Sequence, residues 1–137
     1  MKKTVGVLGV IILMGMMVAA AFGQAVVTGL IVDAKDLSFN PTASVKILDE
    51  EGREVYGSAY LDKQWVEKQG VVGYANSLAD AKGNERVGKN PHVVKAIRVT
   101  GPNNKDLVLS EEDARKVREL GKNLNFLDQA KVVIVVP

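Results

Sequence analysis

The chain of 137 residues contains no cysteine and one histidine, and only 5% of its residues are aromatic. Without cysteine, the fold must be stabilised by its core, and no lipid-bearing cysteine can follow a leader peptide. The single histidine, His92, excludes zinc sites built from several histidines. The aromatic side chains are too dispersed to form a stacking platform for nucleic acid. We therefore predict neither a metal nor a cofactor.

An excess of charge of one sign is also lacking beyond the N-terminal segment. The formal net charge is +2, and Lys2 and Lys3 account for it, so the rest of the chain carries equal numbers of basic and acidic residues. A balanced charge provides no electrostatic basis for binding nucleic acid. Nucleic acid is therefore not an expected partner.

Residues 1–25 have the pattern of a signal peptide. Two lysines precede the uncharged run VGVLGVIILMGMMVAAAF, and small residues follow it, with Ala21, Gly23 and Ala25 as alternative cleavage positions. The run is only just long enough to span a bilayer, so an uncleaved N-terminal anchor is the alternative. We predict a secreted or periplasmic protein with one domain over residues 26–137, because that length supports one core.

Hydrophobic patterning predicts elements in the order βββαββαβ. Strand patterns occur at residues 26–32, 44–48, 54–59, 93–99, 106–109 and 131–136, and helix patterns at residues 62–81 and 110–120. Gly52 suits a hairpin loop, Gly70 marks a possible break in the first helix, and Ser110 with Asp113 forms a capping box. This order predicts an α+β domain whose mixed or mostly antiparallel sheet has about five to six strands, with two helices on one face.

Four residues are candidate surface contacts. Asp33 and Asp36 follow the first strand, where carboxylates can bind a ligand or cation, although a strand that reaches water also ends in polar residues. Tyr56 and Trp65 could line a surface for a carbohydrate or a peptide, and core packing is the alternative. No Gly-x-Ser-x-Gly elbow or phosphate-binding loop occurs in the sequence. We predict no catalytic residues.

Several stretches carry a resemblance to known proteins: VDAKDL, DEEGREVYG and GPNNKDLVLS. With them the chain resembles poorly characterised exported bacterial proteins, and more distantly envelope lipoproteins and the periplasmic flagellar assembly protein T. The resemblance implies a Gram-negative envelope setting and a non-enzymatic role. The missing lipid-bearing cysteine departs from the lipoprotein pattern.

These observations predict an envelope-associated or assembly-accessory protein that acts through protein–protein contact and is not an enzyme. Strand addition at a sheet edge is the expected mode, and residues 44–48 are the candidate edge strand. The alternative function is a periplasmic module that binds a small ligand, a cation or a glycan through the four candidate residues. A hydrolase would require a serine and a carboxylate near His92. The sequence leaves the partner, the pathway and the oligomeric state open.

Overall fold

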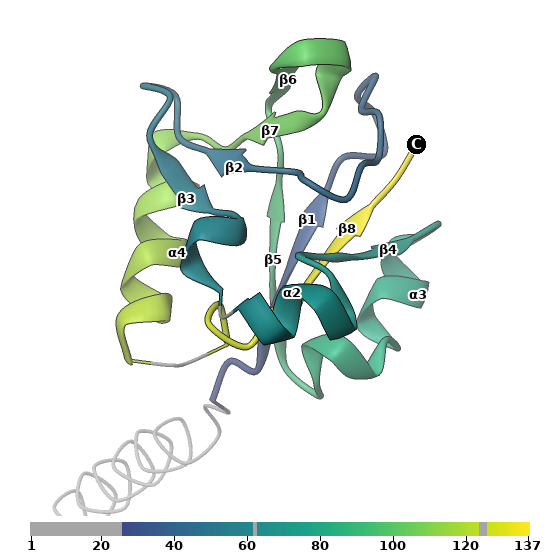
Figure 1. Cartoon of the computed structure of the whole chain (residues 1–137), viewed down its shortest axis with the longest axis vertical. Coiled ribbons are helices and arrows are strands. Elements are labelled where there is room, and N and C mark those ends of the chain that lie inside the picture. The colour runs from purple at the N-terminus through teal and green to yellow at the C-terminus, as the bar shows by residue number, and fades with distance from the viewer. Residues whose placement is uncertain (1–25, 62, 124–125) are drawn as a thin grey trace, which may run out of the picture.

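The computed structural model describes residues 26–61, 63–123 and 126–137. The predicted signal peptide lies outside this part of the chain, as do the side chains of Tyr60, Trp65 and Asn123. Within the described residues, two four-stranded sheets pack with three α-helices and three short 3-10 helices (Figure 1). The helices are α2 (Lys63–Gln69), α3 (Leu78–Lys82), α4 (Glu111–Asn123), η1 (Ser58–Tyr60), η2 (Glu85–Val87) and η3 (Pro102–Asn104).

The first sheet is parallel throughout. Its spatial order is β4 (Gly73–Ala75), β8 (Val132–Val135), β1 (Gly29–Asp33) and β5 (Pro91–Lys95). The two central strands read GLIVD and VVIV, and such continuous apolar runs are typical of strands that are covered on both faces. All four residues of β8 are buried, as this pattern predicts.

The second sheet is mixed. Its order is β3 (Glu54–Tyr56), β2 (Ile47–Leu48), β7 (Asp106–Val108) and β6 (Arg98–Thr100), with β2 and β7 parallel and the two outer pairs antiparallel. The hairpin between β2 and β3 turns at Gly52, whose φ of 84° lies in the left-handed region that glycine adopts without strain. This part of the chain matches the predicted hairpin.

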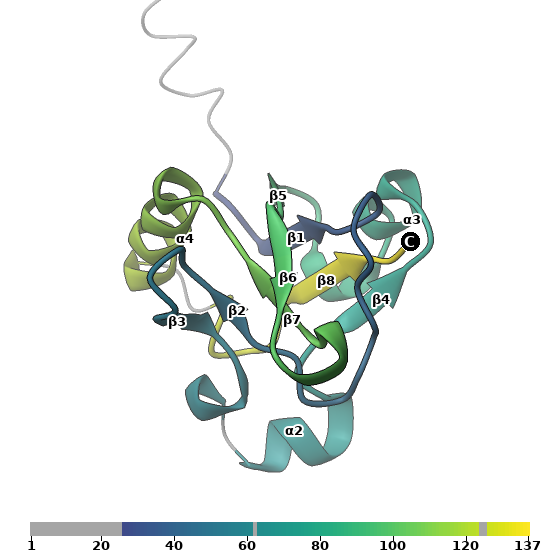
Figure 2. The same ribbon diagram turned by 90° about the horizontal axis from the view of Figure 1, so that it is seen from above.

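Two consecutive residues connect the sheets. The Ala96 amide donates to the Asp33 carbonyl of the first sheet (3.0 Å), and the Ile97 amide donates to the Val108 carbonyl of the second (2.8 Å). The chain therefore leaves one sheet and enters the other without a loop. Helix α4 follows β7 and runs beside the outer side of β5 (Figures 1 and 2).

The larger core lies between the two sheets and beneath α4. Its fully buried members include Leu30, Val32, Ile47, Leu107, Ala114, Val117, Val132 and Ile134. The opposite face of the first sheet packs against α3 and η2 through Ile31, Ala81, Val87, Val133 and Val135. Both faces of the first sheet are therefore covered. Separately, none of the helices in the described part of the chain is long and apolar enough to cross a membrane.

The predicted α+β class is confirmed, but the predicted single sheet is wrong. Residues 93–99 do not form one strand, because β5 and β6 belong to different sheets. The helix predicted over residues 62–81 is also wrong in its middle. It breaks at Gly70, with a φ of 71°, as the sequence suggested, but residues 73–75 form β4 before α3 begins.

Candidate functional site

Strand β4 is the outermost strand of the first sheet on the side opposite β5 (Figures 1 and 2). The Ala75 carbonyl accepts from the Val136 amide (2.9 Å), which directs the backbone of Ala75 toward β8. Because successive backbone groups point to alternate sides of a strand, the N–H and C=O of Tyr74 point away from the sheet. Among the described residues neither group makes a backbone hydrogen bond outside the sheet.

The edge strands β3, β5 and β6 carry features that disfavour pairing. Pro91 in β5 lacks an N–H, and α4 runs along that strand. The Glu54 carbonyl in β3 accepts from Arg118 Nη2 (3.3 Å), and β6 carries the exposed Arg98. Charges, prolines and covering helices are common ways to protect a sheet edge. Strand β4 contains only Gly, Tyr and Ala, so it carries neither a charge nor a proline.

A groove of about 370 Å³ adjoins β4 at its N-terminal end. It is lined by Pro41, Thr42, Ala43, Gly70, Val71, Val72 and Tyr74. Two tyrosines fix its walls, because the Tyr74 hydroxyl donates to the Thr42 carbonyl and the Tyr56 hydroxyl donates to the Val71 carbonyl. Burial raises the pKa of both hydroxyls, which keeps them protonated as donors. We call β4 and this groove the β4 site.

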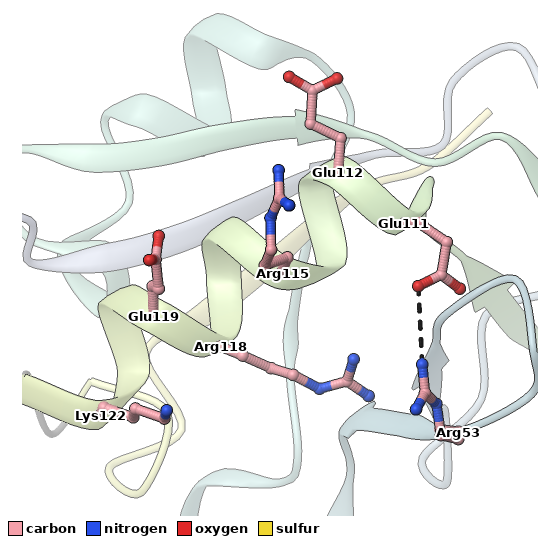
Figure 3. Close-up of a pocket in the computed structure, with 7 residues that line it drawn as sticks. All are labelled: Arg53, Glu111, Glu112, Arg115, Arg118, Glu119 and Lys122. Carbon is pink, nitrogen blue, oxygen red and sulfur yellow. Dashed lines mark ion pairs between the residues drawn. The ribbon is translucent and has the colours of Figure 1, made fainter.

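A second groove, of about 500 Å³, lies on α4 (Figure 3). It is lined by Arg53, Glu111, Glu112, Arg115, Arg118, Glu119 and Lys122. Arg118 extends from α4 toward Arg53, and Arg53 pairs with Glu111 at 3.7 Å. Beneath them lies Asp49, which has no exposed surface.

Asp49 joins the β2–β3 hairpin to α4. Its carboxylate accepts from the amides of Glu51 (3.0 Å) and Arg53 (2.8 Å), from Arg53 Nε (2.9 Å) and from Arg118 Nη1 (3.1 Å). Burial alone would raise the pKa of Asp49, but the hydrogen bonds from Arg53 and Arg118 outweigh it and lower the pKa to about 2. This network holds α4 against the hairpin.

We expect Asp49→Asn to lower the melting temperature at pH 7 by roughly 10 °C, because the amide cannot replace the carboxylate between two guanidinium groups. The folded pKa of Asp49 lies below its ordinary value of 3.8, so its ionised form stabilises the fold above about pH 4. That stabilisation is lost as the pH falls toward 2. Thermal unfolding is measured between pH 7 and pH 2. The melting temperatures of the variant and the parent protein should converge as the pH falls from about 4 toward 2. A constant difference would contradict the network.

Of the candidate residues from the sequence, the three whose side chains the structure describes line no common groove. Asp33 and Asp36 follow β1, where Asp33 Oδ1 accepts from the Lys35 amide (3.0 Å) and Asp36 pairs with Lys95 at 3.2 Å. Tyr56 is fully buried, so its prediction as a surface contact is wrong, and its ring serves core packing. The Trp65 side chain lies outside the described residues. Neither groove is lined by Asp33, Asp36 or Tyr56.

His92 lies on β5 and is partly buried, with its Nε2 atom lacking a hydrogen-bond partner among the described residues. Burial lowers the pKa of His92, and Lys116 lowers it further while Asp113 raises it. The predicted edge strand at residues 44–48 is not an edge, because β2 pairs with β3 on one side and β7 on the other. The β4 site was missed because the glycines at residues 70 and 73 fitted a helical spacing, whereas Val71, Val72 and Tyr74 favoured a strand.

The fold defines an α+β domain of two joined four-stranded sheets. The family model described as Treponema pallidum Tp0624, second domain, matches residues 29–137, and the chain belongs to this family. A search of curated proteins finds no match. The family match does not link the chain to envelope lipoproteins or to flagellar assembly protein T, so that resemblance stays a prediction.

Proposed function

We propose that this domain is a non-enzymatic binding module that acts through protein–protein contact in the bacterial envelope, and that the β4 site receives an extended segment of its partner. The open edge of β4 beside a groove carries the proposal. Main-chain hydrogen bonds to Tyr74 would hold the added strand, and alternate side chains of that strand would face the groove. The predicted leader peptide and the resemblance to exported proteins support the envelope setting.

The edge and the groove fit one mode of recognition. Strand addition obtains affinity from backbone hydrogen bonds and specificity from pockets for every second side chain. The side chain of Tyr74 lines the groove, and its backbone N–H and C=O point away from the sheet. The groove and the open strand edge therefore meet at Tyr74. The hydrogen bonds between Tyr74 and Thr42 hold the groove open before a partner arrives, which reduces the cost of ordering it.

A charge placed in the β4 site is expected to block binding. Val72 lines the groove directly before β4, and we expect Val72→Lys to weaken partner binding at least about tenfold, because the buried contact would be replaced by a hydrated ammonium. A photo-crosslinking residue at Ala43 should first capture the partner from an envelope extract as an adduct of one defined mass. Binding of that partner to each variant is then measured by calorimetry.

Val93→Lys provides the matched control, because Val93 is a partly exposed valine on β5, away from the β4 site. It should bind the captured partner like the parent protein. The partner should also slow hydrogen exchange at the Tyr74 amide. Equal binding by both lysine variants, or unchanged exchange at Tyr74, would refute the proposal.

A further inference from the structure

The outward face of α4 carries a row of four charged residues: Glu112, Arg115, Glu119 and Lys122. Their spacing of three, four and three residues places them on one side of the helix. Ala114 and Val117, which are fully buried, mark the opposite side. All four charged residues are exposed, and Figure 3 shows Glu112, Arg115 and Glu119 projecting from the same side of the helix. We call these four residues the α4 row.

The charges of the α4 row are not used inside the domain. Among the described residues, none of its four members takes part in an ion pair, whereas Arg53, Arg118 and Glu111 beside it do. The neighbouring arginines hold α4 on the hairpin, so the helix is a rigid support for the row. The row therefore presents four exposed charges of alternating sign that form no ion pair among the described residues.

The order of signs along the row is negative, positive, negative, positive. Read in the opposite direction it is positive, negative, positive, negative, so a second copy that runs antiparallel sets each charge against one of opposite sign. If two copies of α4 meet antiparallel about a two-fold axis, Glu112 faces Lys122 of the second copy and Arg115 faces Glu119 of the second copy. The symmetry repeats both pairs, so all four contacts join opposite charges. A parallel pairing in register would place like charges together at every position. Isologous contacts of this kind are the commonest way in which identical chains associate.

We propose that the α4 row is a self-association surface at which a second copy of this chain docks with its α4 antiparallel. A uniformly acidic or basic partner would match only two of the four charges, and the remaining two would repel it. All four residues of the row also line the groove of about 500 Å³ on α4, so the surface at which the second copy docks is the one that carries the row. This inference concerns another element than β4 and does not depend on the function proposed above.

The contact is polar, so the dimer is expected to be weak and sensitive to salt. Exposed ion pairs contribute little each, and their role is to set orientation and partner choice. The Debye length falls from about 30 Å at 0.01 M salt to about 3 Å at 1 M, so dimerisation should be strongest at low ionic strength. Sedimentation equilibrium of the purified protein should show a concentration-dependent rise in mass at low salt that disappears near 1 M.

Two variants with the same net charge as the parent protein test the geometry. Glu112→Lys with Lys122→Glu keeps every antiparallel pair opposite in sign and should dimerise like the parent. Glu112→Lys with Arg115→Glu sets like charges against each other in all four pairs and should raise the dissociation constant at least about tenfold. Both variants lose the same first-turn carboxylate, and the first also replaces Lys122 in the last turn of α4 with an acid, so the melting temperature of each variant is measured as a control for helix stability.

Melting temperatures of the two variants should agree within a few degrees, which shows that both are folded. The proposal is overturned if the parent protein stays monomeric at about 1 mM and low salt, a concentration that still detects weak association. Equal dissociation constants for the two variants would overturn it as well. Non-specific electrostatic attraction would be the same for both, because their net charges are equal.

Discussion

Gly29→Ala is expected to destabilise the domain by about 3 kcal/mol, which corresponds to a fall in melting temperature of roughly 15 °C. A Cβ at Gly29 would lie 2.6 Å from both the Cα and the carbonyl oxygen of Val87, closer than such atoms approach. The contact is with backbone, so a side-chain rotation cannot relieve it.

The neighbouring residues prevent the two segments from moving apart. The Thr28 hydroxyl donates to the Val87 carbonyl (2.7 Å) and accepts from the Asn90 amide (2.9 Å), while the Thr28 amide donates to the Asn90 carbonyl (3.0 Å). Relief of the clash would therefore break hydrogen bonds at the start of β1. Since β1 is central in the first sheet, the displacement would reach the core.

Gly83→Ala is the control for this prediction. Gly83 has a φ of −84°, and its added Cβ would lie 3.6 Å from the nearest atom, which is an ordinary contact. We expect it to be neutral or to stabilise the fold by a few tenths of a kcal/mol, because alanine restricts the unfolded chain. Urea denaturation of both variants measures the difference. Similar stabilities of the two variants would show that the close approach of Gly29 to the Val87 backbone tolerates a side chain.

Arg86→Lys is expected to destabilise the domain by about 3 kcal/mol, although the substitution keeps the positive charge. The Arg86 guanidinium donates to three backbone carbonyls: Ala130 from Nε (2.6 Å), Gln69 from Nη1 (2.7 Å) and Gly70 from Nη2 (2.7 Å). It thereby links η2 to the end of α2 and to the turn before β8. A single ammonium on a flexible stem cannot reach three separated acceptors.

Arg86→Ala should be about as destabilising as Arg86→Lys, because both leave the carbonyls of the α2 terminus without their donor. Arg98→Lys is the control, since exposed Arg98 makes one long contact of 3.4 Å with the Glu50 carbonyl. It should change the free energy of unfolding by less than about 0.5 kcal/mol. Chemical denaturation compares the three variants, and near-parental stability of Arg86→Lys would contradict the multiple-acceptor role.

Local features of the fold were predictable where neighbouring residues determine them. Ser110 caps α4 as predicted, since its hydroxyl accepts from the Asp113 amide (3.1 Å), but among the described residues the Asp113 carboxylate makes no return bond to the Ser110 amide, so only half of the predicted capping box forms. The hairpin around Gly52 and the apolar strand before Asp33 were predictable for the same reason. In each case the signal lies within a few residues, so distant contacts are not needed to interpret it.

The candidate site was less predictable. Tyr56 carries a polar hydroxyl and follows a charged hairpin, which made a surface role plausible, yet Val71 from a distant segment provides its acceptor and allows full burial. The groove beside β4 is built from residues 41–43 and 70–72, which are far apart in the chain. Asp36 meets Lys95 only because β1 and β5 are neighbours.

The sequence by itself determined the α+β class, the positions of most strands and the charge order along α4, because these depend on periodicity and on local capping. The tertiary structure decided that Ala96 and Ile97 bond to different sheets, that β4 is an open edge and that the charged row of α4 faces outward. Strand pairing and burial depend on contacts between distant segments, and a local pattern specifies a strand without specifying its neighbours.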